Sequence, residues 1–204
     1  MKLRIVLWIG IILGYLDNTY IFMKSIFLLV LTISFYPIKS QTIIFFEDNA
    51  LKEKLLEATQ ENKIAKNKDG EKIKIDVDNN GEIDTNEALF VVSLNLYPGD
   101  ISKLGGIEKF ENLKNLDLAT NNLTKFENIN LPNLETLDLL DNDIISLKID
   151  NLKNLRTITC QQNKLKKLSI IGLENLESIF CNINPIRKTV LKNLPKLTHI
   201  GTDN

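Results

Sequence analysis

A run of asparagines at one fixed spacing constrains the fold of this chain more than any other feature. Each of them stands in the same apolar pattern, L-x-x-L-x-L-x-x-N-x-L, in which x is any residue and some leucines are replaced by isoleucine or cysteine. The asparagines are 21 residues apart and comprise Asn121, Asn142, Asn163 and Asn184. A period held over four copies is very hard to obtain by chance, so the sequence predicts stacked repeats that form a solenoid.

A weaker copy of the pattern stands at each end of this run. The first spans residues 91–101 and has Gly99 at the asparagine position, where we expect changes to be tolerated far better than at Asn142 or Asn163. The last spans residues 197–202 and stops before its asparagine. We therefore expect an α/β-type repeat solenoid of about six 21-residue repeats over residues 91–204.

The repeat length limits what each coil can contain. The inward leucines should stack into a continuous core behind one parallel, concave sheet, and each asparagine should bond the backbone of the turn beside it. With 21 residues per coil, the opposite, convex side has room for extended or 3₁₀ segments but not for a long helix.

Residues 1–40 predict a secretory signal peptide. Lys24 precedes an apolar run over residues 26–36, which a polar stretch at residues 39–41 ends, so cleavage is expected after Ser40. Residues 1–22 add a second apolar stretch, which a true translation start at Met23 would explain. The predicted location is therefore secreted, periplasmic or at the cell surface. The alternative is a membrane anchor formed by an uncleaved N-terminus.

Residues 41–90 predict a cap on the solenoid. Apolar positions from Leu51 to Ala58 fit one face of a helix, with Asp48 or Asn49 as its N-cap. Further along, Ile73 and Ile75 alternate with lysines as in a short strand.

The cap contains a segment, residues 76–87, that fits all twelve positions of an EF-hand calcium loop. Carboxylate, amide and carbonyl oxygens are the ligands that Ca²⁺ prefers. The expected ligands are Asp76, Asp78, Asn80, the backbone carbonyl of Glu82, Asp84 and Glu87. No helix is expected to lead into position one, so the alternative is a metal-free turn that caps the solenoid.

Side chains that alternate with the inward leucines should point outward from the sheet. Apolar members of this set are candidate anchors for a partner, and Asp117 and Asp138 form an adjacent acidic pair. The expected ligand-binding residues are Tyr97, Asn115, Asp117, Asp138, Leu140, Thr159, Gln161, Phe180 and Asn182. Such a polar face suits a protein or a carbohydrate ligand. The alternatives are a glycan-acting enzyme that uses the acidic pair, and a repeat remnant without a ligand.

Composition argues against several other functions. The 25 basic and 26 acidic residues nearly balance, so no nucleic-acid partner is expected. Cys160 and Cys181 occupy inward positions and are expected to be small buried side chains. The only histidine, His199, is expected on the surface. We find no nucleophile elbow or phosphate loop, so the sequence predicts that the chain is not an enzyme. We expect it to be a monomer.

At these repeats the chain resembles the secreted leucine-rich-repeat proteins of bacteria, including the internalin-like group and small members from Bacteroidetes. The resemblance covers roughly residues 43–204 and includes the Phe46-x-Asp48-x-x-Leu51 start and the Asp76–Ala88 segment. It implies an N-terminal helical cap over the first coil and a concave sheet that recognises a protein or, in some members, a glycan.

Overall fold

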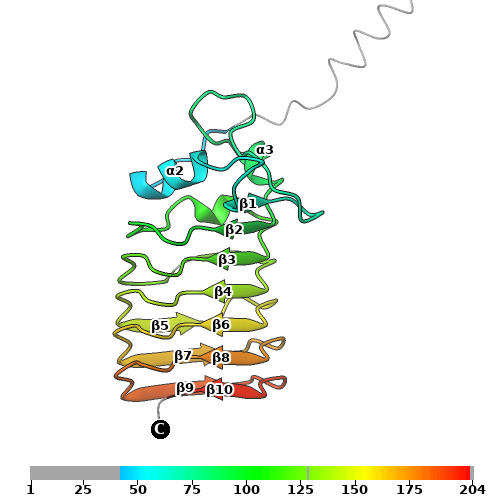
Figure 1. The fold of residues 1–204 in the computed structure, drawn as a ribbon. Coiled ribbons are helices and arrows are strands. Elements are labelled where there is room, and N and C mark those ends of the chain that lie inside the picture. The colour runs from blue at the N-terminus through cyan, green and yellow to red at the C-terminus, as the bar shows by residue number, and fades with distance from the viewer. Residues whose placement is uncertain (1–41, 128, 203–204) are drawn as a thin grey trace, which may run out of the picture. The chain divides into compact units, whose positions relative to one another are not determined.

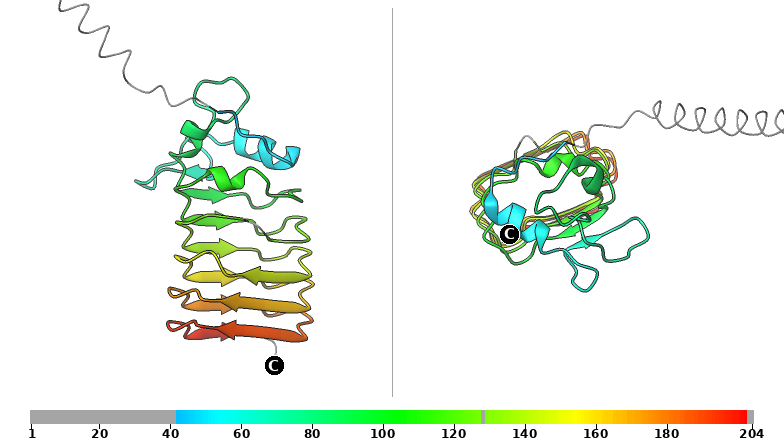
Figure 2. Two further views of the ribbon diagram at one scale, coloured as in Figure 1. Left: turned by 180° about the vertical axis from the view of Figure 1, so that it is seen from behind. Right: turned by 90° about the horizontal axis from the view of Figure 1, so that it is seen from above.

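A computed structural model describes residues 42–127 and 129–202. It shows a leucine-rich-repeat solenoid whose coils stack in a nearly straight column (Figures 1 and 2). The expected signal peptide, residues 1–40, lies outside the described residues. In the described part of the chain, no helix is both long enough and apolar enough to cross a membrane.

One face of the column is a seven-stranded sheet, which we call the front sheet. Its six parallel strands follow the repeat, and their central residues lie in register and face inward. The strand order is β1 (Ala65–Lys66), β2 (Ser93–Asn95), β3 (Asn115–Asp117), β4 (Thr136–Asp138), β6 (Thr157–Thr159), β8 (Ser178–Phe180) and β10 (His199–Gly201). The repeat register predicted from the sequence is thereby confirmed.

The opposite side of the column carries a smaller sheet, which we call the back sheet. The sequence predicted extended or 3₁₀ segments here. In the last coils the extended segments pair in parallel as β5 (Ser146–Ile149), β7 (Lys167–Ile171) and β9 (Lys188–Lys192). In the first coil the corresponding place holds a 3₁₀ helix, η1 (Ile107–Lys109). Apolar residues alternate along these strands and face the front sheet, so the core lies between the two sheets.

The repeated asparagines join each coil to the coil before it. Asn142 Oδ1 accepts the Leu123 N–H at 3.0 Å, and its Nδ2 donates to the Leu118 carbonyl at 2.9 Å. The same side chain donates to Leu139 and Leu140 in its own coil. Asn121 and Asn163 make the equivalent bonds and are likewise buried. These turns would otherwise leave buried backbone groups without partners.

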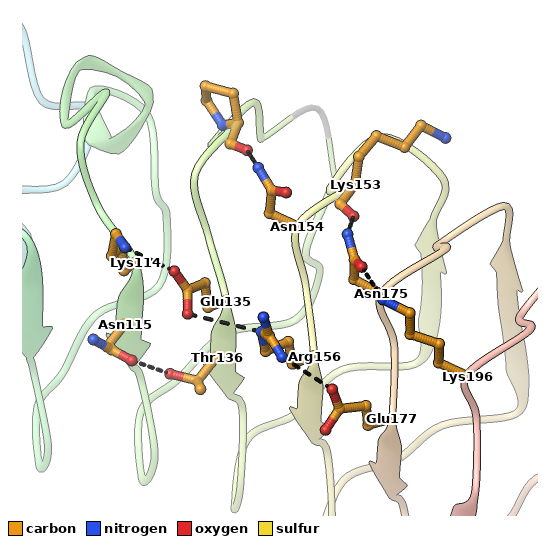
Figure 3. Close-up of polar contacts among 11 residues, drawn as sticks. Lys114, Asn115, Glu135, Thr136, Lys153, Asn154, Arg156, Asn175, Glu177 and Lys196 are labelled. Atoms are coloured by element: carbon orange, nitrogen blue, oxygen red, sulfur yellow. Dashed lines mark hydrogen bonds and ion pairs between the residues drawn. The ribbon is translucent and has the colours of Figure 1, made fainter.

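A second asparagine column runs along the edge of the front sheet. Each member donates its side-chain N–H to a backbone carbonyl of the preceding coil at 2.8 to 3.2 Å. The members are Asn112, Asn133, Asn154 and Asn175. In the last coil Lys196 takes this position, and its Nζ bonds Asn175 Oδ1 at 2.8 Å (Figure 3). This column has the same period as the first and was not predicted.

The N-terminal cap closes the first coil. Helix α2 (Asn49–Leu56) begins after Asp48, whose Oδ1 accepts the Ala50 N–H, so the expected helix and N-cap are confirmed. The other oxygen of Asp48 accepts the N–H groups of Ser102 and Lys103, which ties the cap to the solenoid. We call residues 76–87, which match the calcium loop, the acidic loop, and its last residues begin a short helix, α3 (Thr85–Ala88).

The strand expected at Ile73 and Ile75 is not formed. The chain instead pairs Ala65 and Lys66 with β2 in antiparallel fashion, and Ile73 only donates its N–H to the Ala65 carbonyl. Pairing with β2 completes the edge of the front sheet, and this tertiary gain outweighs local alternation. The segments around β1 project beyond the outline of the coils when seen from above (Figure 2).

Candidate functional site: the front face and the acidic loop

The outward side chains of the front sheet form regular rows across the coils, and we call this surface the front face. One row passes through Asn115 and consists of short polar side chains and His199. The next row comprises Asn95, Asp117, Asp138, Thr159, Phe180 and Gly201. Tyr97, Leu140, Gln161 and Asn182 follow the ends of their strands. All nine predicted ligand-binding residues are exposed or half-buried.

The three apolar members of the front face do not form one cluster. Tyr97 is 52% exposed and Phe180 is 37% exposed, whereas Leu140 is half-buried. Tyr97 follows β2 and Phe180 ends β8, which lies four strand positions away, or about 19 Å at ordinary strand spacing. A single small ligand cannot contact both side chains, so an occupant of this face must be extended along the solenoid.

Many polar side chains of the front face bond one another. Thr136 Oγ1 donates to Asn115 Oδ1 at 2.8 Å, and Gln161 Nε2 donates to Asn182 Oδ1 at 3.2 Å. These bonds hold the side chains in fixed positions before a partner arrives, which lowers the entropy cost of binding.

The acidic pair lies side by side, because Asp117 and Asp138 are register partners on β3 and β4. Each carboxylate accepts a backbone N–H two residues along its chain, from Ala119 at 3.0 Å and from Leu140 at 2.9 Å. Burial raises the pKa of Asp138 above its usual value, and the charge of Asp117 adds to this rise, although the Leu140 N–H opposes it.

An open hollow of about 320 Å³ lies over this acidic pair. Lys63 and Lys66, from the β1 segment, line it together with residues of the first four parallel strands. Sequence reasoning missed these two lysines because it placed the cap strand at residues 73–75. The hollow therefore presents both signs of charge to a partner.

An alternating charge ladder borders the front face. Lys114 pairs with Glu135 at 2.9 Å, and Arg156 lies 3.9 Å from Glu135 and 3.0 Å from Glu177 (Figure 3). These exposed pairs contribute little stability. They do neutralise one another, so this border offers no net charge to a partner.

The acidic loop brings three of its expected ligands together. Carboxylate oxygens of Asp76, Asp78 and Glu87 lie within 4.8 Å of one another. None of the salt bridges among the described residues involves these three groups. Their mutual repulsion would be relieved by a cation, and the donor set suits Ca²⁺.

The side chains of Asp84, Asn80 and Glu82 make other contacts, although the ligand expected at Glu82 is its backbone carbonyl. Asp84 is fully buried and caps α3, because its Oδ1 accepts the N–H groups of Asn86 and Glu87 while Glu87 accepts the Asp84 N–H. Asn80 Oδ1 accepts the Glu82 N–H at 2.7 Å, and the Glu82 side chain pairs with Lys52.

The two cysteines are buried in adjacent coils, as expected. A hydrogen bond with Cys181, together with burial, raises the pKa of the Cys160 thiol. A thiol held protonated in this way is a poor nucleophile. His199 is exposed, as expected, and its Nδ1 lies 2.8 Å from Thr198 Oγ1.

Neither a protein-family model nor a curated protein matches the chain. Among solved structures, internalin C2 from Listeria monocytogenes is similar to it, with 18% identity and a TM-score of 0.33. The similarity covers 79% of this chain and 98% of that one. The repeat register and the stacked coils of the chain itself identify the fold as a leucine-rich-repeat solenoid.

Proposed function

We propose that this chain is an exported recognition module that binds a protein or a glycan along its front face. The observation that carries the proposal is the exposed Phe180. Its neighbours Ile179 and Cys181 are buried, so the fold requires apolar residues on either side of it but not at position 180 itself. An exposed aromatic side chain on a polar sheet contributes free energy when a partner covers it.

The arrangement of the front face supports a ligand that runs along the column. Tyr97 lies beside the first parallel strand of the front sheet and Phe180 on the next to last. The mixed-charge hollow lies over the first four parallel strands. A folded protein surface or an oligosaccharide of several units can contact both regions. Export of the chain is part of this proposal, supported by the apolar run before Ser40.

The test is a binding screen of the chain against glycan arrays and against surface proteins of neighbouring cells. For any ligand found, Phe180→Ala should weaken binding by at least about 1 kcal/mol, or about fivefold in Kd. The matched control is Glu174→Ala, which changes an exposed side chain in the connection from β7 to β8. Loss of affinity in the control but not in Phe180→Ala would place the site elsewhere.

The same screen addresses the enzymatic alternative. If the hollow hydrolysed glycans, bound oligosaccharides would be shortened over time, and Asp138→Asn would stop that shortening while leaving binding intact. A ligand that is bound and recovered unchanged supports recognition alone.

We also propose that the acidic loop binds Ca²⁺ and thereby stabilises the cap. Support comes from the cluster of Asp76, Asp78 and Glu87 and from the twelve-position match around it. The absence of a helix before Asp76 makes this a weak structural site of the extracellular kind. The proposed ligand set remains the six predicted positions, and Asp76, Asp78 and Glu87 are three of these, with carboxylate oxygens within 4.8 Å of one another.

Calcium titration followed by thermal unfolding tests this site. Millimolar Ca²⁺ should raise the melting temperature, because a ligand that binds the folded state stabilises it by mass action. Asp78→Asn should reduce the rise, and it is preferable to a Glu87 variant because Glu87 also bonds the Val77 and Asp84 N–H groups. An unchanged melting temperature, with no heat of binding, would leave the loop as a turn only.

A further inference from the structure

Four positively charged residues stand together where two neighbouring back strands begin, and we call them the basic quartet. Lys166 and Lys167 stand where β7 begins, and Arg187 and Lys188 take the same places one coil later, where β9 begins (Figure 1). Lys167 and Lys188 are register partners, and the Lys166 carbonyl accepts the Arg187 N–H at 3.0 Å. The two pairs of residues are therefore about 4.8 Å apart at ordinary strand spacing.

The quartet carries charge that the rest of the described chain does not neutralise. All four side chains are exposed, and none takes part in a salt bridge among the described residues. By contrast, Lys148 on β5 pairs with Asp150, and Lys164 pairs with Asp143. Like charges beside each other in a sheet are destabilising, so an anion bound over the quartet would relieve their repulsion.

The fold does not require positive charge at these positions. One coil earlier the same places hold Ile145 and Ser146, which pair with the next coil in the same way. Lys166 and Lys167 have a coil on either side and are still exposed, so their exposure does not depend on where the column ends. Clustered charge that the fold does not need can attract a partner of opposite charge.

The distribution of charge along the column favours a narrow partner. Residues 42–142 contain 20 acidic and 11 basic side chains, whereas residues 143–202 contain 4 acidic and 10 basic ones. A broad anionic surface, such as a membrane, would also approach the acidic half of the column and be repelled by it. A narrow anionic chain can lie across β7 and β9 alone.

The back sheet favours a polysaccharide over a nucleic acid as this chain. Proteins bind single-stranded nucleic acids by stacking bases on aromatic side chains, and β5, β7 and β9 contain no aromatic residue. One sugar of an extended polysaccharide is about as long as the spacing between strands, about 4.8 Å. Acidic groups on successive sugars can therefore reach successive coils. The Arg187 guanidinium can also bind a carboxylate through paired hydrogen bonds.

We propose that the basic quartet binds an acidic polysaccharide that carries a carboxylate on each sugar. The polymer runs along the column across β7 and β9. One carboxylate lies over Lys166 and Lys167, and the next lies over Arg187 and Lys188. This surface is on the opposite side of the column from the front face and does not depend on the function proposed there.

The test measures binding of polygalacturonate oligosaccharides to the full chain by isothermal titration calorimetry. The acid form should bind at least about tenfold more tightly than its methyl ester, which has the same sugars without the charge. Lys166→Gln combined with Lys167→Gln should weaken binding of the acid form at least about fivefold. The matched control combines Lys68→Gln with Lys103→Gln, which removes the same charge at exposed cap positions and should leave affinity unchanged. Thermal unfolding checks that each variant is folded.

Two further measurements separate this site from other modes of binding. Phe180→Ala, which alters the front face, should leave affinity for the acid oligosaccharide unchanged. Monomeric galacturonic acid should bind at least about tenfold more weakly than the oligosaccharide, because it reaches only one coil.

Three kinds of result overturn the proposal. The first is equal binding of the acid and the ester, or of the monomer and the oligosaccharide. The second is a loss of affinity in the cap control or in Phe180→Ala that matches the loss in the Lys166 and Lys167 variant. The third is tighter binding to vesicles of anionic phospholipid or to single-stranded DNA, because the occupant would then be a different polyanion.

Discussion

Replacing Asn142 by alanine tests the role of the asparagine column most directly. The substitution removes the only acceptor that we identify for the Leu123 N–H, which lies in a fully buried residue. It also removes one donor each from the Leu118, Leu139 and Leu140 carbonyls. Each of these carbonyls keeps another bond, from Asn121 at 3.1 Å, from Asn163 at 2.7 Å and from the Thr120 N–H at 2.8 Å respectively. The loss of stability is therefore expected to come mainly from the buried Leu123 N–H, which is left without an acceptor.

A buried donor without a partner costs about 1–3 kcal/mol. At about 2–4 °C per kcal/mol for a chain of this size, the melting temperature should fall by roughly 2–12 °C. Urea unfolding followed by circular dichroism gives the free energy directly.

Asn122→Ala is the matched control, because Asn122 lies next to Leu123 in the preceding coil but is exposed, and its side chain makes only a 3.4 Å contact with Asp100. This control should change stability by less than about 0.5 kcal/mol. If Asn142→Ala cost no more than the control, the coils would not depend on this column, and the reasoning would be refuted.

Three further predictions follow from the same contacts. Gly99→Ala should destabilise the first coil, as measured by urea unfolding, because a Cβ at this position would lie 2.7 Å from Asn121 Oδ1; a neutral result would show that Asn121 can move. Asp138→Asn should raise the melting temperature at pH 7, because a carboxyl whose pKa is raised by folding is destabilising when ionised, and the gain should vanish as the pH falls below the ordinary aspartate value and the wild-type side chain is protonated. N-terminal sequencing of exported protein should begin at or near Gln41, whereas an intact N-terminus on membranes would indicate an anchor.

The repeat could be predicted from the sequence because its geometry is periodic. Leu116, Leu137 and Ile158 stand at equal spacing, and only stacking places them in one core. Asn133 and its equivalents carry the same period, so the second asparagine column was visible in the sequence as well. These asparagines lie outside the apolar pattern that defines the repeat, so the pattern alone did not assign them a role.

The cap was predicted less well because its structure depends on contacts with the first coil. Ile73 and Ile75 alternate like a strand, yet Lys66 pairs with Ser93, and no local pattern shows that β2 needs a neighbour. Asp84 and Glu87 illustrate a second limit. Their spacing suits positions nine and twelve of a calcium loop and also suits a helix capping box, so residue types alone cannot separate the two roles.

The coil-to-coil bonds have a consequence for how the chain folds. Asn142 and Asn163 each reach only into the preceding coil, and every front strand from β3 onward pairs with its predecessor in the repeat. The loop that must close to add a coil is therefore nearly the same each time, and its entropy cost does not grow along the column. Folding can therefore start at the capped end and advance one coil at a time, each coil being held by the coil before it.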